Sequence, residues 1–199
     1  EKGTIHAEHV VNCGGLWARE VGRMVGLELP VLAMEHMYFV TEDIPEIVAY
    51  NKEHGNDFFF NDTATTEIYT RQERNGMVLG TYEKACVPWQ PKQTPWDFGA
   101  ELLPPDLDRI APSLEIGFRH FPSMAKAGIK RVINGPFTFS PDGNPLVGPV
   151  QGLRNLWLAE GFSFGITAAG GTGHYLAQMM TEGEAEIDMA SLDPKRYGN

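Results

Sequence analysis

The residues most suited to binding a ligand lie in a glycine-rich stretch near the end of the chain. Its first part follows an apolar run at 155–159 and contains Gly161, Phe162, Ser163, Phe164, Gly165 and Ile166. The small residues among them let the backbone approach a flat ligand. Gly170, Gly171 and Gly173 come next, and we predict that they open the last helix. Unpaired N–H groups at a helix start attract negative charge, which predicts an anion site. Glycines also pack helices against strands in many folds, so that alternative stays open.

Two further groups of residues are candidates for a site. Cys13, Gly14 and Gly15, followed by Trp17, form a tight exit from an apolar strand, which suits ligand contact or strand-to-helix packing. Tyr38 lies two residues after His36 in a β-rich run. A strand tyrosine belongs to a core more often than to a site, and spacing alone does not separate the two.

The elements that must position these residues follow from the apolar pattern. Strands and helices are mixed with a hairpin, which indicates an α/β (α+β) fold in which a nucleotide-binding domain is joined to an antiparallel-sheet domain. We predict strands at 4–6, 9–12, 36–41, 130–135 and 155–159, helices at 16–26, 106–121 and 172–182, a loop at 88–105, and a hairpin at 71–82 around Asn75-Gly76.

Composition bounds the class of protein. The chain has 199 residues, of which 42% are hydrophobic and 11% aromatic, enough for one sizeable core. A net charge of −10 and a pI near 5.0 argue against nucleic acid or an anionic membrane surface as a partner. Two distant cysteines give no disulfide framework or metal site. No apolar run reaches the ~20 residues of a membrane span, so we expect a soluble protein, and the start at Glu1 looks like mid-chain.

The segment 58–70 differs from the rest of the chain. Residues 61–70 read NDTATTEIYT, the translation of AAT GAT ACG GCG ACC ACC GAG ATC TAC AC, which resembles a common sequencing-library adapter. The three phenylalanines before it, 58–60, would then come from poly-T. We interpret 58–70 as a chimeric insertion in the gene; a real polar loop is the alternative. We infer no function from this segment.

Several segments together resemble one family of flavoproteins. They are 10–19 (VVNCGGLWAR), 35–38 (EHMY), 71–76 (RQERNG), 134–136 (NGP) with 140–143 (SPDG), and 192–198 (LDPKRYG). In order and spacing these are similar to the dimethylglycine and sarcosine dehydrogenases, members of the D-amino-acid-oxidase-like superfamily. The resemblance implies the C-terminal half of an FAD oxidoreductase domain. A partial FAD/NAD(P)-binding Rossmann-like domain (1–30 and 136–199) would be interleaved with an antiparallel-sheet substrate domain (31–135).

The resemblance also implies roles for the candidate residues. Cys13, Gly14, Gly15 and Trp17 match a segment that contacts FAD, 161–166 match the segment that passes the isoalloxazine ring, and Gly170, Gly171 and Gly173 match the helix start beneath it. Tyr38, with His36 before it, matches a strand whose tyrosine lies near the substrate amine and the flavin. The family often has Gln between the two, where this chain has Met37.

The activity implied by the resemblance is flavin-dependent oxidative demethylation of an N-methylglycine, dimethylglycine or sarcosine. The substrate amine would give a hydride to flavin N5, as in other amine dehydrogenases and oxidases that act on CH–NH donors. Tetrahydrofolate in a region after residue 199 and an electron-transfer flavoprotein are the implied onward partners. The implied location is the cytoplasm in a bacterium and the mitochondrial matrix in a eukaryote.

One motif of a complete dinucleotide site is missing from the sequence. A G-x-G-x-x-G turn after a first strand does not occur in the chain, so we expect it to bind FAD weakly by itself. Two alternatives stay open. One is a non-catalytic regulatory relative of these dehydrogenases, and the other is a different FAD-dependent amino-acid or amine oxidase. The histidines have no metal-ligand spacing, and we expect no metal.

Overall fold

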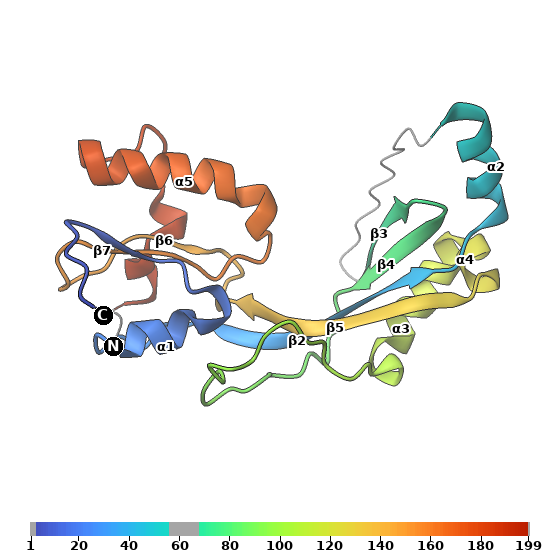
Figure 1. Cartoon of the computed structure of the whole chain (residues 1–199), viewed down its shortest axis with the longest axis horizontal. Coiled ribbons are helices and arrows are strands. Elements are labelled where there is room, and N and C mark those ends of the chain that lie inside the picture. Colours follow the sequence, from blue (N-terminus) through green and yellow to red (C-terminus); the bar gives the residue numbers. More distant parts are fainter. Residues whose placement is uncertain (1–2, 56–67, 199) are drawn as a thin grey trace. The chain divides into compact units, whose positions relative to one another are not determined.

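The computed structural model describes residues 3–55 and 68–198, which form two compact units. The first unit contains Glu1–Met34, Pro88–Phe98 and Phe137–Asn199, and the second contains Glu35–Val87 and Gly99–Pro136 (Figure 1). The stretch Pro88–Phe98 belongs to the first unit, whereas the sequence placed it in the substrate segment. The mixture of helices with parallel and antiparallel strands confirms the predicted fold class.

The first unit is a small sheet with a helix on each face (Figure 1). The strand order is β1-β7-β6, with β1 parallel and β6 antiparallel to β7. Leu146 and Leu158 pack with Ala18 on one face, while Val147 packs with Leu176 on the other. The elements are β1 (Val10–Asn12), η1 (Gly15–Trp17), α1 (Ala18–Arg23), β6 (Leu146–Pro149), β7 (Leu156–Glu160), α5 (Gly165–Glu182), η2 (Ala190–Leu192) and η3 (Pro194–Tyr197).

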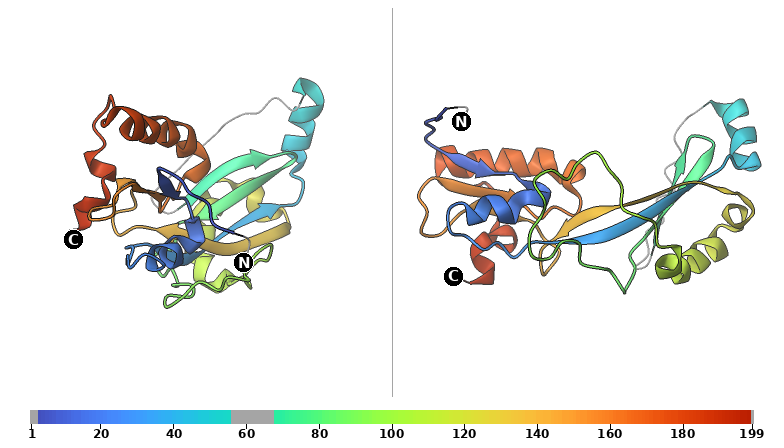
Figure 2. Two further views of the ribbon diagram at one scale, coloured as in Figure 1. Left: turned by 60° about the vertical axis from the view of Figure 1, so that its left-hand side comes forward. Right: turned by 60° about the horizontal axis from the view of Figure 1, so that its bottom comes forward.

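The second unit is a four-stranded sheet in the order β3-β4-β2-β5, and β4 is antiparallel to both of its neighbours. Helix α3 lies against one face of this sheet (Figure 2). A Cβ added at Gly117 in α3 would lie 2.7 Å from Leu79, so this glycine allows the close approach of helix and strand. The elements are β2 (Leu32–Thr41), α2 (Pro45–His54), β3 (Ile68–Glu73), β4 (Gly76–Thr81), α3 (Leu107–His120), α4 (Pro122–Lys126) and β5 (Ile129–Phe139). The start of β2, up to Met34, and the end of β5, from Phe137, belong to the first unit.

Most of the predicted elements occur, with differences that have physical reasons. The hairpin around Asn75-Gly76, the loop at 88–105 and the helix at 106–121 are confirmed. The strand predicted at 4–6 is wrong, because residues 3–9 form no strand and Thr4–His6 is exposed. Five of the described elements were not predicted: α2, α4, β6, η2 and η3. No helix in residues 3–55 and 68–198 is long and apolar enough to cross a bilayer.

Part of the segment interpreted as an insertion is described by the structure. Residues 58–67 lie outside the described residues. Ile68–Thr70 form the first half of β3, in register with Thr81–Leu79 of β4. Ile68 and Thr70 are buried there. The insertion therefore stays a hypothesis about the gene.

Candidate functional site

A pocket of about 380 Å³ lies in the first unit where β7 ends and α5 begins. Three parts of the chain that are far apart in the sequence form its walls: the exit of β1, Thr138 near the end of β5, and the stretch from the end of β7 into the first half of α5. Six of the residues predicted to contact a cofactor line it: Cys13, Gly15, Gly161, Phe162, Gly165 and Gly173. The structure thus brings six of the thirteen predicted residues into one cavity.

Glycines keep this pocket open. A Cβ added at Gly15 or at Gly173 would meet no atom within 4 Å, so a side chain at either position would extend into free space at the pocket wall. Gly15 (φ +53°) and Gly161 (φ +72°) also have left-handed backbone conformations that favour glycine. Part of the wall is therefore bare backbone, which suits contact with a flat ligand.

The start of the last helix differs from the prediction. Helix α5 begins at Gly165, and its first turn is closed by a hydrogen bond from the Ala168 N–H to the Phe164 oxygen at 3.0 Å. The amides without an intrahelical partner are therefore those of 165–167, and Gly170, Gly171 and Gly173 lie inside the helix. The prediction took the glycines as a turn before the helix, but Ala168 and Ala169 ahead of them are strong helix formers, and the helix runs through all of these residues.

The other predicted contact residues lie around the pocket or away from it. The Trp17 indole donates to the Pro95 oxygen at 2.9 Å, so it holds the loop of the first unit. Gly14 packs in the turn after β1, where an added Cβ would lie 3.0 Å from Asn12. Phe164 and Ile166 are 65% and 100% exposed. Ser163 has a buried hydroxyl with no hydrogen-bond partner among the described residues.

Glu160 is a pocket residue that the sequence analysis did not identify. It is the last residue of β7, and only 1% of it is exposed. Its carboxylate accepts hydrogen bonds from the N–H of Gly14 and, at 2.8 Å, from the N–H of Gly15. Burial raises the pKa of Glu160 to about 7, although both backbone hydrogen bonds act to lower it. An acidic residue that ends an apolar strand before a glycine was the signal available in the sequence.

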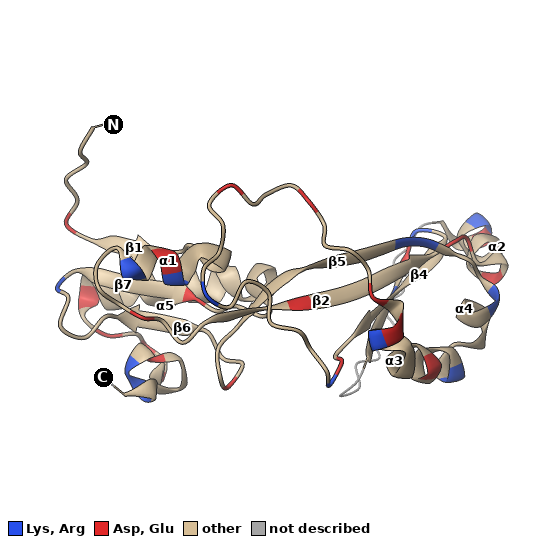
Figure 3. Ribbon diagram, turned by 90° about the horizontal axis from the view of Figure 1, so that it is seen from below, with Lys and Arg blue, Asp and Glu red and all other residues tan. Residues whose placement is uncertain are grey.

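Tyr38 lines a second pocket, of about 740 Å³, in the second unit. It shares this pocket with Arg71 of β3 and with Arg131 near the start of β5, where basic residues are visible in Figure 3. Tyr38 and His36 lie two residues apart on β2, and the residues between and beside them, Met37 and Phe39, are buried. Alternate strand residues face the same side, so Tyr38 and His36 share the face that α3 does not cover.

His36 lies next to a buried ionic cluster rather than in the Tyr38 pocket. Its Nδ1 is 3.9 Å from the Glu83 carboxylate, and burial lowers its pKa while Glu83 opposes the shift. The Arg109 guanidinium lies 3.6 Å from Glu83 and 3.0 Å from Glu35. Asn134 donates to the same Glu35 oxygen at 3.1 Å. This cluster joins β2, α3, β5 and the chain after β4, and the sequence analysis did not identify it.

Two of the motifs behind the resemblance are explained by structure rather than by a site. Arg196 in η3 forms an ion pair with Asp142 at 2.8 Å, and the Tyr197 hydroxyl accepts the Asp142 N–H at 3.2 Å. Hydrogen bonds from Arg196 hold the pKa of Asp142 well below its usual range.

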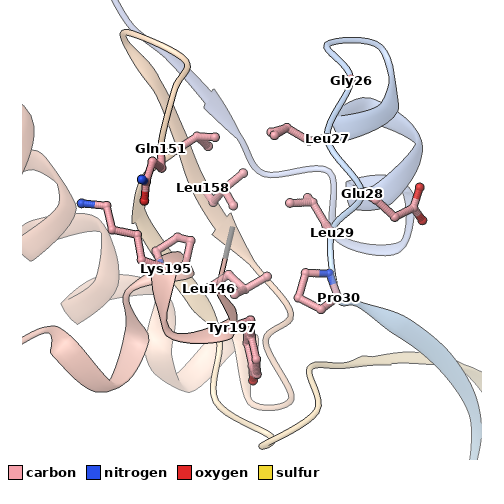
Figure 4. A pocket seen from close by; sticks show the side chains of 13 residues that line it. Gly26, Leu27, Glu28, Leu29, Pro30, Leu146, Gln151, Leu158, Lys195 and Tyr197 are labelled. Atoms are coloured by element: carbon pink, nitrogen blue, oxygen red, sulfur yellow. The ribbon is translucent and has the colours of Figure 1, made fainter.

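A separate groove of about 540 Å³ is lined by Leu29, Leu146 and Leu158 (Figure 4). The residues predicted to bind a cofactor or substrate do not line this groove.

Comparison with known proteins decides the family. Residues 1–179 match the sequence pattern of the family described as FAD dependent oxidoreductase, DAO. The chain belongs to this family. The resemblance seen in the motifs is thereby confirmed, and FAD is the cofactor in the name of the family.

Relatives within the FAD dependent oxidoreductases are longer proteins. The chain is 44% identical to mitochondrial dimethylglycine dehydrogenase of Mus musculus over 99% of its own length and 23% of that protein. It is 35% identical to mitochondrial sarcosine dehydrogenase of Mus musculus over 99% of the chain and 20% of that protein. The chain thus spans about a quarter of the length of these relatives.

A solved structure shows the same fold. The L-proline dehydrogenase of P. horikoshii superposes with a TM-score of 0.71 and 22% identity, over 95% of this chain and 46% of that one. At this identity the likeness shows the fold alone.

The pocket at the end of β7 fits part of an FAD molecule. Its walls at Gly15 and Gly173 leave room that a side chain would fill, and the first amides of α5 belong to the adjoining segment. FAD supplies a ring that accepts a hydride when it is bound. In the described residues no group of three or more His, Cys, Asp or Glu side chains is placed to hold a metal ion.

Proposed function

We propose that this chain is the C-terminal half of an FAD-dependent oxidoreductase domain that oxidises an N-methylated glycine, dimethylglycine or sarcosine. The observation that carries the proposal is the pocket bounded by the Cys13–Gly15 turn, the end of β7 and the start of α5. The 44% identity to a dimethylglycine dehydrogenase supports the choice of substrate class.

The walls of this pocket have simple tasks. The backbone at Gly15 and Gly173 lies against the flat ring, and a side chain at either position would occupy the space that the ring needs. The free amides in the first turn of α5 favour negative charge on the edge of the ring beside them. Positioning and electrostatics are therefore the contribution of this unit, while the cofactor supplies the redox chemistry.

Tyr38 is the proposed substrate contact in the second unit. Its hydroxyl hydrogen-bonds the carboxylate or the amine of the substrate, and Arg71 in the same pocket attracts the carboxylate. We also propose His36 as part of the catalytic machinery, oriented by Glu83. This pair belongs to the open face of the sheet, which is the face available to a ligand.

The onward steps of the reaction are proposals that rest on the resemblance alone. Tetrahydrofolate bound outside this chain takes up the one-carbon product, and an electron-transfer flavoprotein takes the electrons. The two mouse relatives have mitochondrial names, which supports the matrix as the location if the source is a eukaryote. For a bacterial source we propose the cytoplasm.

The experiment that tests the function follows the flavin colour of the complete protein without oxygen. Dimethylglycine, sarcosine, glycine and proline are added one at a time, and loss of the oxidised flavin absorbance is recorded. We expect bleaching by an N-methylated glycine and little by the other two. A bound flavin that no amine bleaches would favour the regulatory alternative, and bleaching by a primary amino acid alone would favour another oxidase.

A further inference from the structure

We propose that Glu160 is a positioning residue of the flavin pocket, whose carboxyl group holds the Cys13–Gly15 turn against the end of β7 and so fixes one wall of the pocket. The identity of the ligand rests on the proposed function. The holding of the turn does not, because it depends only on contacts within the first unit.

The register of the sheet places Glu160 at the turn. Strand β1 runs parallel to β7, and Asn12, the last residue of β1, lies beside Leu158. Two residues further on, β7 reaches Glu160, and the segment that follows β1 turns away at Gly14. One carboxylate oxygen of Glu160 accepts the Gly14 N–H, and the other accepts the Gly15 N–H. Gly15 and Glu160 are 145 residues apart in the sequence.

Asn12 holds the inner side of the turn, and Glu160 holds the side that faces the pocket. Asn12 accepts the Gly14 N–H at 3.0 Å and donates to the Ala18 oxygen at 3.0 Å, so it braces the inner side of the turn. The Gly15 amide has Glu160 as the partner that the structure shows. Gly15 also lines the pocket and has a left-handed backbone. Loss of the carboxylate therefore releases the part of the turn that faces the ligand.

The charge of Glu160 restricts which part of FAD this wall can face. The titratable side chains that line the pocket are Glu160 and Cys13, so no cation lines it. Burial, and then the charge of Glu160, raise the pKa of the Cys13 thiol. A pyrophosphate beside an unpaired carboxylate would be repelled. The wall therefore faces the ring and the hydroxyl-bearing chain of the cofactor, whose O–H and N–H groups are donors.

The protonation of Glu160 gives the wall a dependence on pH. Burial raises its pKa to about 7, so the carboxyl gains or loses its proton near neutrality. The ionised form accepts an amide at each oxygen, whereas the protonated form has one oxygen that carries hydrogen. The hydrogen bonds from Glu160 to the turn are thus stronger above pH 7 than below it.

Residue-resolved hydrogen exchange of the complete protein tests the proposal. Protection factors of the Gly14 and Gly15 amides are measured for the wild type, Glu160→Gln and the control Glu184→Gln, whose side chain is exposed. We expect Glu160→Gln to lower protection at one or both amides by about tenfold, the loss of one hydrogen bond. In the wild type the protection rises between pH 6 and pH 8, and in Glu160→Gln this rise disappears. Glu184→Gln behaves like the wild type.

A FAD titration of the same proteins supplies the second measurement. We expect the Kd for FAD to rise about tenfold in Glu160→Gln, with little change in Glu184→Gln. Unchanged protection and an unchanged pH profile in Glu160→Gln overturn the proposal. If protection falls and no variant, wild type included, binds FAD, the role of Glu160 in holding the turn is supported and the proposed function fails.

Discussion

The pocket at the end of β7 and the ionic cluster around Arg109 hold their carboxyl groups in different ways. Glu160 in the first unit is 1% exposed and is held by the amides of Gly14 and Gly15. Glu35 and Glu83 in the second unit are held by the Arg109 guanidinium. Burial raises the pKa of Glu160 to about 7, so its carboxyl changes protonation near neutral pH, whereas Glu35 and Glu83 each have an arginine as ion-pair partner.

The two groups of carboxyls therefore have different roles: one forms part of a binding pocket, and the other holds the second unit together. In the first unit the carboxyl lies on the pocket itself, so its state affects the ligand directly. In the second unit the ionic cluster lies behind His36 and joins four parts of the unit. We expect changes in the cluster to act mainly on folding, and changes at the wall to act mainly on binding.

The largest expected effect follows from removal of the arginine. Arg109→Met leaves the buried Glu83 side chain and the half-buried Glu35 side chain without their cation, which destabilises the fold by about 3–5 kcal/mol. Urea unfolding measures this loss. The control is Arg119→Met on the same helix, where the side chain is exposed and the change stays within about 0.5 kcal/mol. Equal effects of the two variants would show that the cluster does not hold the unit together.

The next effect concerns the pH dependence of stability. The pKa of Glu160 is raised from 4.5 to about 7 in the folded state, so folding favours the protonated form. This contribution to stability is present below pH 4.5 and is lost as pH rises to about 7. The wild type should therefore lose about 3 kcal/mol relative to Glu160→Gln over this range. Parallel stability curves for the two proteins would contradict the assignment.

A smaller effect is expected from filling the pocket. Gly173→Leu puts a side chain into the free space at the pocket wall, and we expect the Kd for FAD to rise about a hundredfold, or about 2.7 kcal/mol. The fold should not weaken, because leucine is a better helix former than glycine. Thr181→Leu, at an exposed position of α5 two turns beyond Gly173 that does not line the pocket, is the control. If a FAD titration gives the same Kd for the two variants, the flavin does not bind in this pocket.

The smallest effect belongs to the proposed substrate contact. Tyr38→Phe removes one hydroxyl from its pocket, and we expect kcat/KM for an N-methylated glycine to fall about tenfold, or about 1.4 kcal/mol. Steady-state kinetics with dye reduction measures it. Tyr50→Phe on α2, outside this pocket, should leave the rate unchanged. If both variants are fully active, Tyr38 is a core residue of the sheet.

How far the sequence predicted this molecule depended on the distance between partners. The Asn75-Gly76 turn between two extended runs specifies its own hairpin, and it was predicted correctly. The start of α5 was placed too late, because Gly170, Gly171 and Gly173 were taken as a turn. Ala168 and Ala169 before them are strong helix formers, and the helix continues through the glycines.

The site was predicted only where its residues are consecutive in the chain. Gly15, Gly161 and Gly173 stood out by their type and spacing, and the structure brings them together. Glu160 contacts residues 145 positions away, and Arg109 contacts one 74 positions away. A lone acidic residue or arginine in a sequence does not indicate such a partner, so these two groups became visible only in the folded chain.

A crystal structure of the complete flavin-bound protein tests the central claim most directly. We predict that the isoalloxazine ring lies in van der Waals contact with the backbone at Gly161 and Gly173, with the Cys13–Gly15 turn held by Glu160 at its edge. A structure in which side chains from elsewhere in the protein fill this pocket, while the flavin binds at another place, would contradict the account.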